Sequence, residues 1–526
     1  MKEIIKDKYN ICFFIILVIA IFSRIILLDK YPDGIHEDEA GMMYDAYCMA
    51  NYGTDRYLNQ NPVYLINFGG GQSVLYAVLA SIFIKIFGLS LFVVRLPAVI
   101  FSIITIVLAY ILSKRYIGKR FSLIFSFLIT ICPWHIMQSR WGLDCNLLPS
   151  FIMISIYTIL NSKKDWHYII CGIFWGLTLY TYALSYIMLP VLFLILCLYL
   201  LYTKKITFKQ ILITIIPIFT LAIPLILVQI VNYFKNGGIK LGIFTIPKLY
   251  TYRISEIGFE NILKNLNFFS DNNIFQLMFV ADHNEFNSFK AFGTIYYILI
   301  PFVIIGLIIA IKKSIISIRK KEFNLQTVFI IQFICIFICV LIFSDLQLYK
   351  LNSIFITLLA FACNGIMYIY YKKHIIGYFI IVFLILNFVV FEIYYFRNIN
   401  NKIGVAFNKD VIPLVKYLNK EYPDKEIFME TDAIQQYIYV LIANKTSPHD
   451  FKNNMIMIQF RTGETEVMEI EGYNFLHYEL NKDTIYVLEE NNVFRKEQVE
   501  RIAKELEEEG FKKEEYNNFL IYTYPK

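Results

Sequence analysis

Twelve apolar stretches follow one another along the first three quarters of the chain, separated by short polar connections. Most are long enough, or nearly so, to cross about 30 Å of hydrocarbon as an α-helix. The pattern therefore predicts a polytopic α-helical membrane protein. The stretches occupy approximately residues 11–28, 74–87, 95–113, 121–134, 147–160, 167–184, 186–202, 210–232, 294–311, 326–343, 351–370 and 375–396.

Lysine and arginine gather in five short clusters between these stretches. Each cluster is separated from the next by two apolar stretches, so all five should lie on one side of the membrane. The positive-inside rule makes that side cytoplasmic. The clusters are Lys114-Arg115 with Lys119-Arg120, Lys163-Lys164, Lys204-Lys205, the basic residues of 312–321, and Lys372-Lys373.

The stretch 74–87 decides the topology, because a full crossing there would put every later basic cluster outside. It is short and contains Lys85, which favours an interfacial or re-entrant helix. We therefore predict about eleven transmembrane helices plus interfacial helices. The segments that then share the outer face are the loops 29–94, 135–146, 233–293 and 344–350, together with the C-terminal segment.

The composition changes from about residue 397, where Lys, Glu, Asp and Asn become frequent. We expect residues 1–396 to form the transmembrane domain and residues 397–526 a small extracytoplasmic α/β domain. Amphipathic periodicity predicts helices at 409–420 and 496–509, and apolar runs predict strands at 426–430, 484–488 and 519–524.

The overall composition excludes several classes of protein. Apolar residues make up 57% and charged residues 17%, with a mean hydropathy of +0.54, so a soluble, disordered or coiled-coil chain is not indicated. The net charge of +7 comes from clusters that orient helices, so no nucleic-acid partner is expected. The nine cysteines form no CxxC pair, which argues against a disulfide framework or a zinc ribbon.

The first outer loop carries Glu37, Asp38 and Glu39 directly after the first apolar stretch. Three adjacent carboxylates repel one another, and here they would stand just above the membrane. They could serve as a general base or a metal site for a substrate whose tail lies in lipid. They could equally be a solvated acidic loop that caps a following helix.

A second polar group occupies the short outer loop 135–146, which holds Arg140 and Asp144. The predicted topology puts Asp144 at the same membrane level as Asp38. Two acidic groups on one face with an arginine beside them are typical of a catalytic cleft. The alternative is that Asp144 caps a helix and Arg140 anchors the chain at the interface.

These residues belong to an ordered set of motifs. The sequence resembles the GT-C glycosyltransferases of the protein O-mannosyltransferase and lipid A aminoarabinose transferase type, over roughly residues 10–190 and elsewhere by architecture. The motifs are, in order, Asp38-Glu39, an aromatic-rich loop at 44–68, Phe87-Gly88-Leu89, Arg95-Leu96-Pro97, a basic turn, Pro133-Trp134-His135, Ser139-Arg140 and Asp144.

The resemblance implies a GT-C fold and a monosaccharide donor carried on polyprenyl phosphate within the membrane. It also implies inverting transfer to a hydroxyl group of a protein, lipid or cell-wall glycan outside the cytoplasmic membrane. By position, Asp38 matches the family's catalytic acidic residue and would act as the base. Glu39 completes the Asp-Glu pair, and Asp144 matches the second loop carboxylate.

The run Gly69-Gly70-Gly71-Gln72 departs from the family pattern, because relatives often have a basic residue and a proline there. Its backbone amides could form an anion nest, or the run could be a plain flexible turn. We predict that the donor phosphate is bound instead by Arg140, Lys350 and Tyr349. The alternative for Lys350 is that it only snorkels to the membrane surface.

Four further residues are predicted to contact substrate: His36, Glu37, Tyr44 and Asp282. The aromatic side chains of the outer loops could instead form an interface belt. Neighbouring positions such as 282–285 rarely converge on one ion, so we expect no metal site and no cofactor besides the donor.

Two alternative functions remain open. One is a metal-dependent oligosaccharyltransferase or glycan ligase of the same fold class. The other is a transporter, for which charges at mid-membrane and internal repeats would be typical; neither is evident in this sequence.

Overall fold

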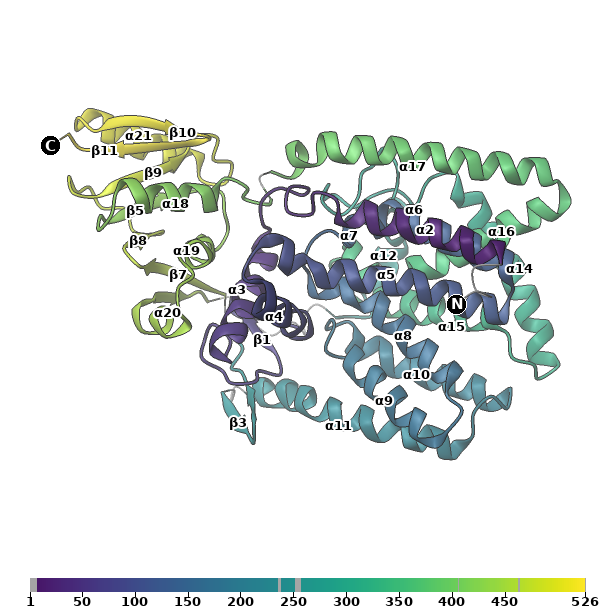
Figure 1. The fold of residues 1–526 in the computed structure, drawn as a ribbon. Helices are drawn as coiled ribbons and strands as arrows, with labels where there is room; N and C mark the ends of the chain where they lie inside the picture. The colour runs from purple at the N-terminus through teal and green to yellow at the C-terminus, as the bar shows by residue number, and fades with distance from the viewer. Residues whose placement is uncertain (1–6, 235–237, 251–256, 405, 462–463, 526) are drawn as a thin grey trace.

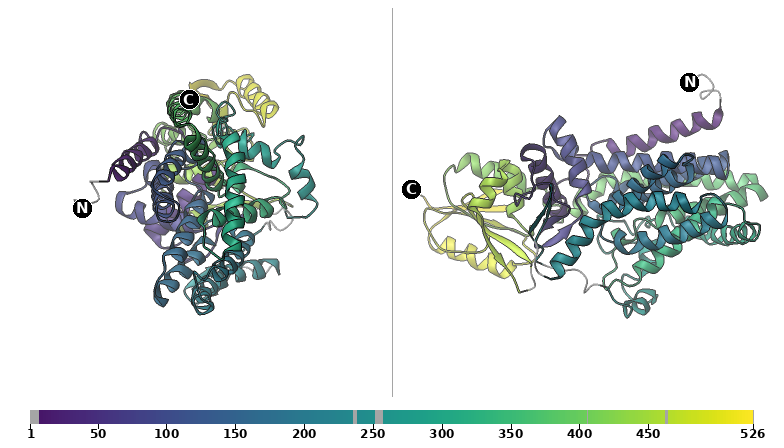
Figure 2. Two further views of the ribbon diagram at one scale, coloured as in Figure 1. Left: turned by 90° about the vertical axis from the view of Figure 1, so that its right-hand side faces the viewer. Right: turned by 90° about the horizontal axis from the view of Figure 1, so that it is seen from below.

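The structure, a computed structural model, describes residues 7–234, 238–250, 257–404, 406–461 and 464–525. Parts of the predicted outer loop 233–293, namely 235–237 and 251–256, lie outside the described residues. Helices run side by side in an elongated bundle, and a smaller lobe of strands and helices lies at one end (Figure 1). The view from below shows the same division between bundle and lobe (Figure 2, right).

Seven described helices are long and apolar enough to cross a membrane. Shorter helices occupy the other four stretches that were predicted to cross, and the polytopic helical fold class is confirmed. The seven are α2 (Lys8–Ile25), α5 (Leu91–Tyr116), α10 (Ser185–Tyr202), α11 (Phe208–Tyr233), α14 (Leu299–Arg319), α16 (Phe355–Lys372) and α17 (His374–Ile403). The four are α6 (Lys119–Ile131), α8 (Leu148–Asn161), α9 (Asp165–Thr178) and α15 (Leu325–Val340).

Glycines allow some of these helices to approach closely. A Cβ atom at Gly306 of α14 would lie 1.7 Å from the Phe361 carbonyl oxygen of α16, and one at Gly365 of α16 would lie 2.2 Å from the Phe302 carbonyl oxygen. At Gly172 of α9, a Cβ would lie 2.3 Å from the carbonyl oxygen of Thr214 in α11. Small residues at such contacts are typical of membrane helix pairs, where close packing drives association.

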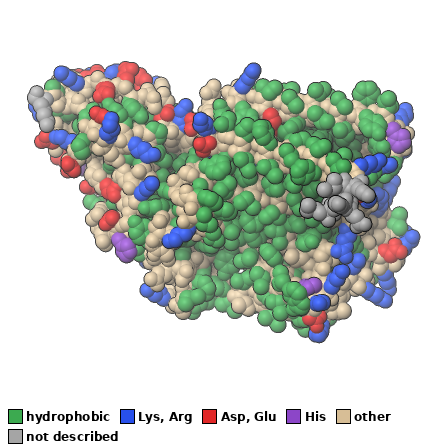
Figure 3. Space-filling model, in the orientation of Figure 1, with side chains coloured by type: hydrophobic (Ala, Val, Ile, Leu, Met, Phe, Trp, Pro, Cys, Tyr) green, Lys and Arg blue, Asp and Glu red, His purple; other side chains and the backbone are tan. Residues whose placement is uncertain are grey.

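The basic clusters meet at the end of the bundle opposite the lobe. Lys119 pairs with Asp7 at 2.8 Å, while the Lys205 ammonium lies 5.5 Å from the centre of the Tyr116 ring and 4.9 Å from that of Phe323. Figure 3 shows Lys and Arg side chains gathered at this end and a broad apolar surface between it and the lobe. These contacts bring Lys205 beside Tyr116, within the first basic cluster, and beside Phe323, next to the cluster of 312–321.

The short helix α4 (Leu75–Phe87) lies at the other end, beside α3 (Glu37–Tyr52) (Figure 1). Its 13 residues span only about 20 Å, as do those of α6, so its position beside α3 rather than its length sets it apart from the predicted spans. The Lys85 ammonium donates to the Ala50 carbonyl oxygen of α3 at 2.9 Å. These features agree with the predicted interfacial helix.

The remaining elements of the bundle are short and lie mainly in the connections. They are β1 (Leu65–Asn67), β2 (Gly70–Gln72), α7 (Pro133–Gln138), η1 (Asp144–Leu147), β3 (Ile239–Leu241), β4 (Phe244–Ile246), α12 (Asn261–Leu266), α13 (Ile274–Phe279) and η3 (Leu348–Leu351).

The C-terminal lobe is built on a seven-stranded sheet of order β10-β11-β9-β5-β8-β7-β6. The two helices and three strands predicted here are confirmed, as α18, α21, β5, β9 and β11. The elements are α18 (Val411–Glu421), β5 (Ile427–Glu430), α19 (Tyr437–Asn444), α20 (Pro448–Asn454), β6 (Ile456–Gln459), β7 (Thr465–Ile470), β8 (Tyr473–Asn474), β9 (Ile485–Glu489), α21 (Lys496–Glu508), β10 (Lys512–Tyr516) and β11 (Phe519–Thr523).

Alternation along the central strands gives this sheet two apolar faces. Phe428 and Leu488 pack with Ile502 of α21 in one core cluster. The neighbouring strand residues Ile427 and Val487 belong to a second cluster, which also contains residues of α18, α19 and α3. The lobe therefore shares a core with the first outer loop.

Hydrogen bonds complete the attachment of the lobe to α3. The Tyr439 hydroxyl donates to the carbonyl oxygen of Ile35 at 3.0 Å, and the Tyr47 hydroxyl donates to that of Lys445 at 2.9 Å. Helix α17 leads directly into the lobe and extends to Ile403, beyond the domain boundary predicted at residue 396.

Candidate active site

The acidic motif of the first outer loop forms the first turn of α3. The His36 imidazole caps the helix, since its Nδ1 accepts a hydrogen bond from the Asp38 amide at 3.2 Å. Glu37, Asp38 and Glu39 follow, where the helix dipole favours carboxylates. A capped helix and a functional acidic site are therefore compatible here.

Asp38 has one oxygen fixed and the other available. Its Oδ1 accepts a hydrogen bond from the Asn67 side-chain amide at 3.0 Å, while no described residue donates to Oδ2. The nearest ionisable partner of Oδ2 is Nδ1 of His36, at 4.0 Å. The Asp38 side chain is 43% exposed, so its carboxylate can meet a substrate.

Asp38 lines a cavity of about 540 Å³ between the bundle and the lobe. The predicted outer loops meet around this cavity, each contributing at least one side chain, and the lobe covers part of its mouth. Lining residues include His36 and Glu37 from the first loop, Trp141 from 135–146, His283 and Glu285 from 233–293, Tyr349 from 344–350, Lys402 from α17, and Ile434 and Phe494 from the lobe.

Glu37 is the second carboxylate beside Asp38 in this cavity. Burial raises the pKa of Glu37, and the charge of Asp38 adds to that effect, while the His36 ring lowers it. Glu37 therefore holds a proton more readily than an ordinary glutamate.

The third carboxylate of the acidic motif, Glu39, forms a buried ion pair with Arg95. It is fully buried, and its two oxygens accept from Nε and Nη2 of Arg95, each at 2.9 Å. The Gly142 amide also donates to Glu39 Oε1 at 2.6 Å. Glu39 was predicted to be catalytic; in this structure its carboxylate joins three segments of the chain and does not line the cavity.

Arg95 uses its remaining donors on the loop that precedes α3. Nη1 donates to the carbonyl oxygens of Leu28 and Pro32, at 2.9 and 2.7 Å, and Nη2 donates to that of Gly34 at 3.0 Å. The Glu39–Arg95 pair thus fixes the backbone that positions Asp38.

Asp144 also lies away from the cavity lining. It is buried at the start of η1, where Oδ2 accepts from the Ser73 amide at 3.1 Å and Oδ1 accepts from the Cys145 amide at 2.8 Å. These contacts hold the turn before α4. The Asp144 side chain does not cap η1 or α8, whose N-cap residues are Leu143 and Leu147.

Arg140 was predicted to bind the donor phosphate, but in this structure its guanidinium faces backbone carbonyl oxygens and does not line the cavity. The side chain is fully buried and donates to the carbonyl oxygens of Ser23, Ile26 and Tyr31, at 2.9, 2.8 and 2.9 Å. Its guanidinium also lies 5.2 Å from the centre of the Phe396 ring. Arg140 therefore satisfies backbone carbonyl oxygens at the carboxyl end of α2.

Lys350 and Tyr349, the other predicted phosphate ligands, are neighbours in η3, but their side chains have different surroundings. Lys350 is buried, and its ammonium donates to the Asp345 carbonyl oxygen at 2.7 Å and lies 5.2 Å from the centre of the Phe343 ring. Tyr349 lines the cavity, with its ring edge against Tyr182. Only Tyr349 of the two is placed to meet a ligand in this cavity.

Two of the four predicted substrate contacts are also engaged elsewhere. Asp282 accepts from the Leu348 amide at 2.9 Å and the Asn287 side chain at 3.0 Å, which joins two outer loops. Tyr44 is fully buried and donates to the Thr446 carbonyl oxygen at 3.0 Å. The other two, His36 and Glu37, do line the cavity.

The glycine run is part of a hairpin between β1 and β2. Phe68 and Gly69 adopt φ values of 51° and 87° at its turn, which favours glycine in the second position. A Cβ atom at Gly71 would lie 2.0 Å from the Tyr64 ring. The hairpin carries Asn67 to Asp38, a contact that sequence reasoning missed.

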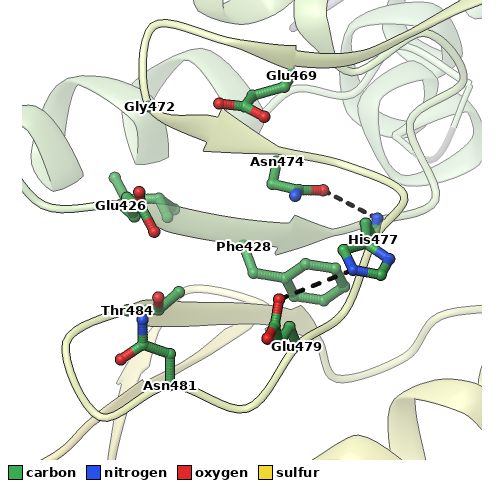
Figure 4. A pocket seen from close by; sticks show the side chains of 10 residues that line it. Glu426, Phe428, Glu469, Gly472, Asn474, His477, Glu479, Asn481 and Thr484 are labelled. Carbon is green, nitrogen blue, oxygen red and sulfur yellow. Dashed lines mark hydrogen bonds and ion pairs between the residues drawn. The ribbon is translucent and has the colours of Figure 1, made fainter. Parts of the chain in front are cut away.

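A second cavity, of about 180 Å³, lies wholly within the lobe (Figure 4). Glu426, Glu469, His477 and Glu479 line it, and the close-up shows His477 beside Glu479, 3.9 Å apart. No residue of the bundle borders this cavity, so it offers no route for a membrane lipid. In the part of the chain that the structure describes, no three His, Cys, Asp or Glu side chains are grouped to hold a metal ion.

Residues 72–232 match the model of the dolichyl-phosphate-mannose-protein mannosyltransferase family. This segment runs from the β1–β2 hairpin to the end of α11 and includes Arg95, Arg140 and Asp144. No curated protein sequence matches the chain significantly.

Solved structures resemble the chain over most of its length. The apo structure of ArnT from Cupriavidus metallidurans matches with a TM-score of 0.52 and 12% identity, covering 83% of this chain and 84% of that one. The same protein bound to undecaprenyl phosphate gives 0.49 and 11%, covering 98% and 99%. The archaeal oligosaccharyltransferase AglB from Archaeoglobus fulgidus gives 0.48 and 13%, covering 84% of this chain; the chain spans 64% of AglB.

The likeness to apo ArnT confirms the GT-C fold that the sequence predicts. Together with the family match, it supports a multi-pass membrane protein of the glycosyltransferase type.

Proposed function

We propose that the protein transfers a monosaccharide from a polyprenyl-phosphate donor to an acceptor hydroxyl group on the outer face of the cytoplasmic membrane. The observation that carries this proposal is the Asp38 carboxylate, oriented by Asn67 at the cavity where the outer loops meet. The description of the matching family names a dolichyl-phosphate sugar as donor and a protein as acceptor, which supports this substrate class.

In the proposed reaction, the acceptor hydroxyl oxygen attacks the anomeric carbon of the donor sugar. Oδ2 of Asp38 takes the hydroxyl proton as the new carbon–oxygen bond forms. The bond between the anomeric carbon and the phosphate oxygen breaks on the opposite face, so the anomeric configuration inverts. The polyprenyl phosphate leaves with the electron pair of that bond.

The distribution of charge supports the outer location. Five basic clusters lie between the predicted spans, and those whose contacts were described above meet at the end of the bundle opposite the lobe. Since basic loops stay in the cytoplasm, the Asp38 cavity and the lobe would face outward. Ile434 and Phe494 are exposed at the cavity mouth and would contact the acceptor, whether protein, lipid or cell-wall glycan.

The test is sugar transfer by the purified protein in proteoliposomes, with labelled polyprenyl-phosphate sugars offered one at a time. Asp38→Asn should lower transfer by about 10²–10⁴-fold, because the amide is nearly isosteric but cannot take a proton. Asp29→Asn, an exposed change in the same loop, is the matched control and should keep full activity. Transfer by Asp38→Asn at the control rate would refute the assignment of the base.

A further inference from the structure

The phosphate that leaves in this reaction needs a positive charge, and the two cations predicted from the sequence do not supply one. The Arg140 guanidinium donates to backbone carbonyl oxygens at the end of α2, and the Lys350 ammonium donates to the backbone carbonyl oxygen of Asp345. Among the described residues that line the Asp38 cavity, Lys402 is the one lysine, and none is an arginine.

The height of Lys402 suits a lipid headgroup. Helix α17 has 30 residues and would be about 45 Å long, whereas the hydrocarbon core is about 30 Å thick. Its apolar stretch ends at Phe396, so Lys402 stands about 9 Å further along the helix, on the side of the lobe. A lysine side chain at this level reaches toward the phosphates of the membrane surface.

The other charged side chains of the cavity are carboxylates, which repel an anionic ligand, so such a ligand needs the positive charge of Lys402. The carboxylates that line the cavity are Glu37, Asp38, Glu285 and Asp432, and Lys402 pairs with Glu285. Both members of this pair are partly exposed, at 31% and 43%, so the pair is weak and easily exchanged. Without Lys402 the described lining of the cavity would offer no lysine or arginine to a phosphate group.

We infer that Lys402 binds the donor phosphate and that Glu285 holds the lysine in the cavity until the phosphate takes the place of the carboxylate. This inference rests on the proposed function, since it assigns the phosphate subsite of the same cavity. The donor phosphate is a diester with one negative charge, like the carboxylate. When the sugar leaves it becomes a monoester, which carries more charge than one carboxylate and offers more acceptor oxygens, so the exchange is favoured as transfer proceeds.

The test is the binding of undecaprenyl phosphate to the purified full-length protein in detergent, followed by native mass spectrometry, with neutral undecaprenol as the uncharged comparison. Lys402→Gln should weaken phosphate-lipid binding about tenfold or more, as loss of a charged contact does, and leave the weak undecaprenol binding unchanged. Lys402→Arg should largely restore binding. Glu285→Gln should bind the phosphate lipid at least as tightly as the unaltered protein does.

The matched control is Arg397→Gln, which removes an exposed positive charge from the same end of α17 without touching the cavity. It should bind within about twofold of the unaltered protein, because exposed charges contribute little. Equal phosphate-lipid binding by Lys402→Gln and the unaltered protein would overturn the inference. No preference of the unaltered protein for undecaprenyl phosphate over undecaprenol would instead count against the proposed donor class.

Discussion

The side-chain amide of Asn67 donates to Oδ1 of Asp38 over 3.0 Å, and this bond links the β1–β2 hairpin to the first turn of α3. The hairpin places Asn67 through the turn at Phe68 and Gly69. One carboxylate oxygen is thereby fixed and the other turned toward the cavity. Asn67 thus acts as a positioning residue for the proposed base.

The first prediction follows from this bond. Asn67→Ala should lower kcat for sugar transfer about tenfold or more while changing the donor KM little, because a hydrogen bond to a charged group is worth about 1.5–3 kcal/mol. Transfer kinetics with varied donor would measure both constants. An unchanged kcat would mean that Asp38 keeps its orientation without Asn67.

The fold could be predicted from the sequence further than the site. Periodicity located the apolar helices because each one depends on its own residues. In the lobe, β10 was missed, since its sequence Lys512–Tyr516 is charged and its apolar partners lie on β11. β8 was missed because two residues carry too little pattern.

The site was predicted only in part because long-range partners decide what each charge does. Arg140 donates to Ser23, 117 positions away, and no local pattern reveals that contact. Glu39 and Arg95 are 56 positions apart. Lys402 sits in a polar run after an apolar stretch, a setting in which most lysines only mark the membrane surface.

The second prediction concerns the Glu39–Arg95 pair. Removing either partner leaves a buried charge alone, which typically costs about 3–5 kcal/mol of folding stability. Arg95→Met should therefore lower the unfolding temperature in detergent strongly, whereas Asp38→Asn should leave it nearly unchanged. If the two variants unfolded at the same temperature, the pair would not be a structural one.

The third prediction is that Arg140 stabilises the fold and does not bind the donor phosphate. Arg140→Gln should lower the unfolding temperature, because backbone carbonyl oxygens at the end of α2 lose their donors, at about 1–3 kcal/mol for each group left unsatisfied. The folded fraction should keep the donor KM of the unaltered protein. A raised donor KM with an unchanged unfolding temperature would instead show that Arg140 binds the donor phosphate.

The fourth prediction uses the raised pKa of Glu37. Because burial raises this pKa above its ordinary value near 4.5, the folded state binds the proton more tightly than the unfolded state does. The Glu37 contribution therefore makes folding less favourable as pH rises from about 4.5 through the raised pKa. Glu37→Gln should remove that part of the pH dependence, measured as unfolding temperature against pH. An identical pH profile in both proteins would contradict the assignment.

The last prediction is that sugar transfer persists in excess EDTA. A divalent-metal site must gather several oxygen or nitrogen ligands around one ion, and no such group of His, Cys, Asp or Glu exists among the described residues. In the proposed mechanism, the ammonium of Lys402 stabilises the leaving phosphate as a fixed charge, so no ion is needed there. Transfer rates should thus be equal with and without EDTA, while Lys402→Gln should be slow in both conditions. Loss of activity in EDTA with rescue by manganese or magnesium would overturn this, and Glu37, Asp38 and Glu285 would then have to be reconsidered as ligands that gather only when the ion and donor bind together.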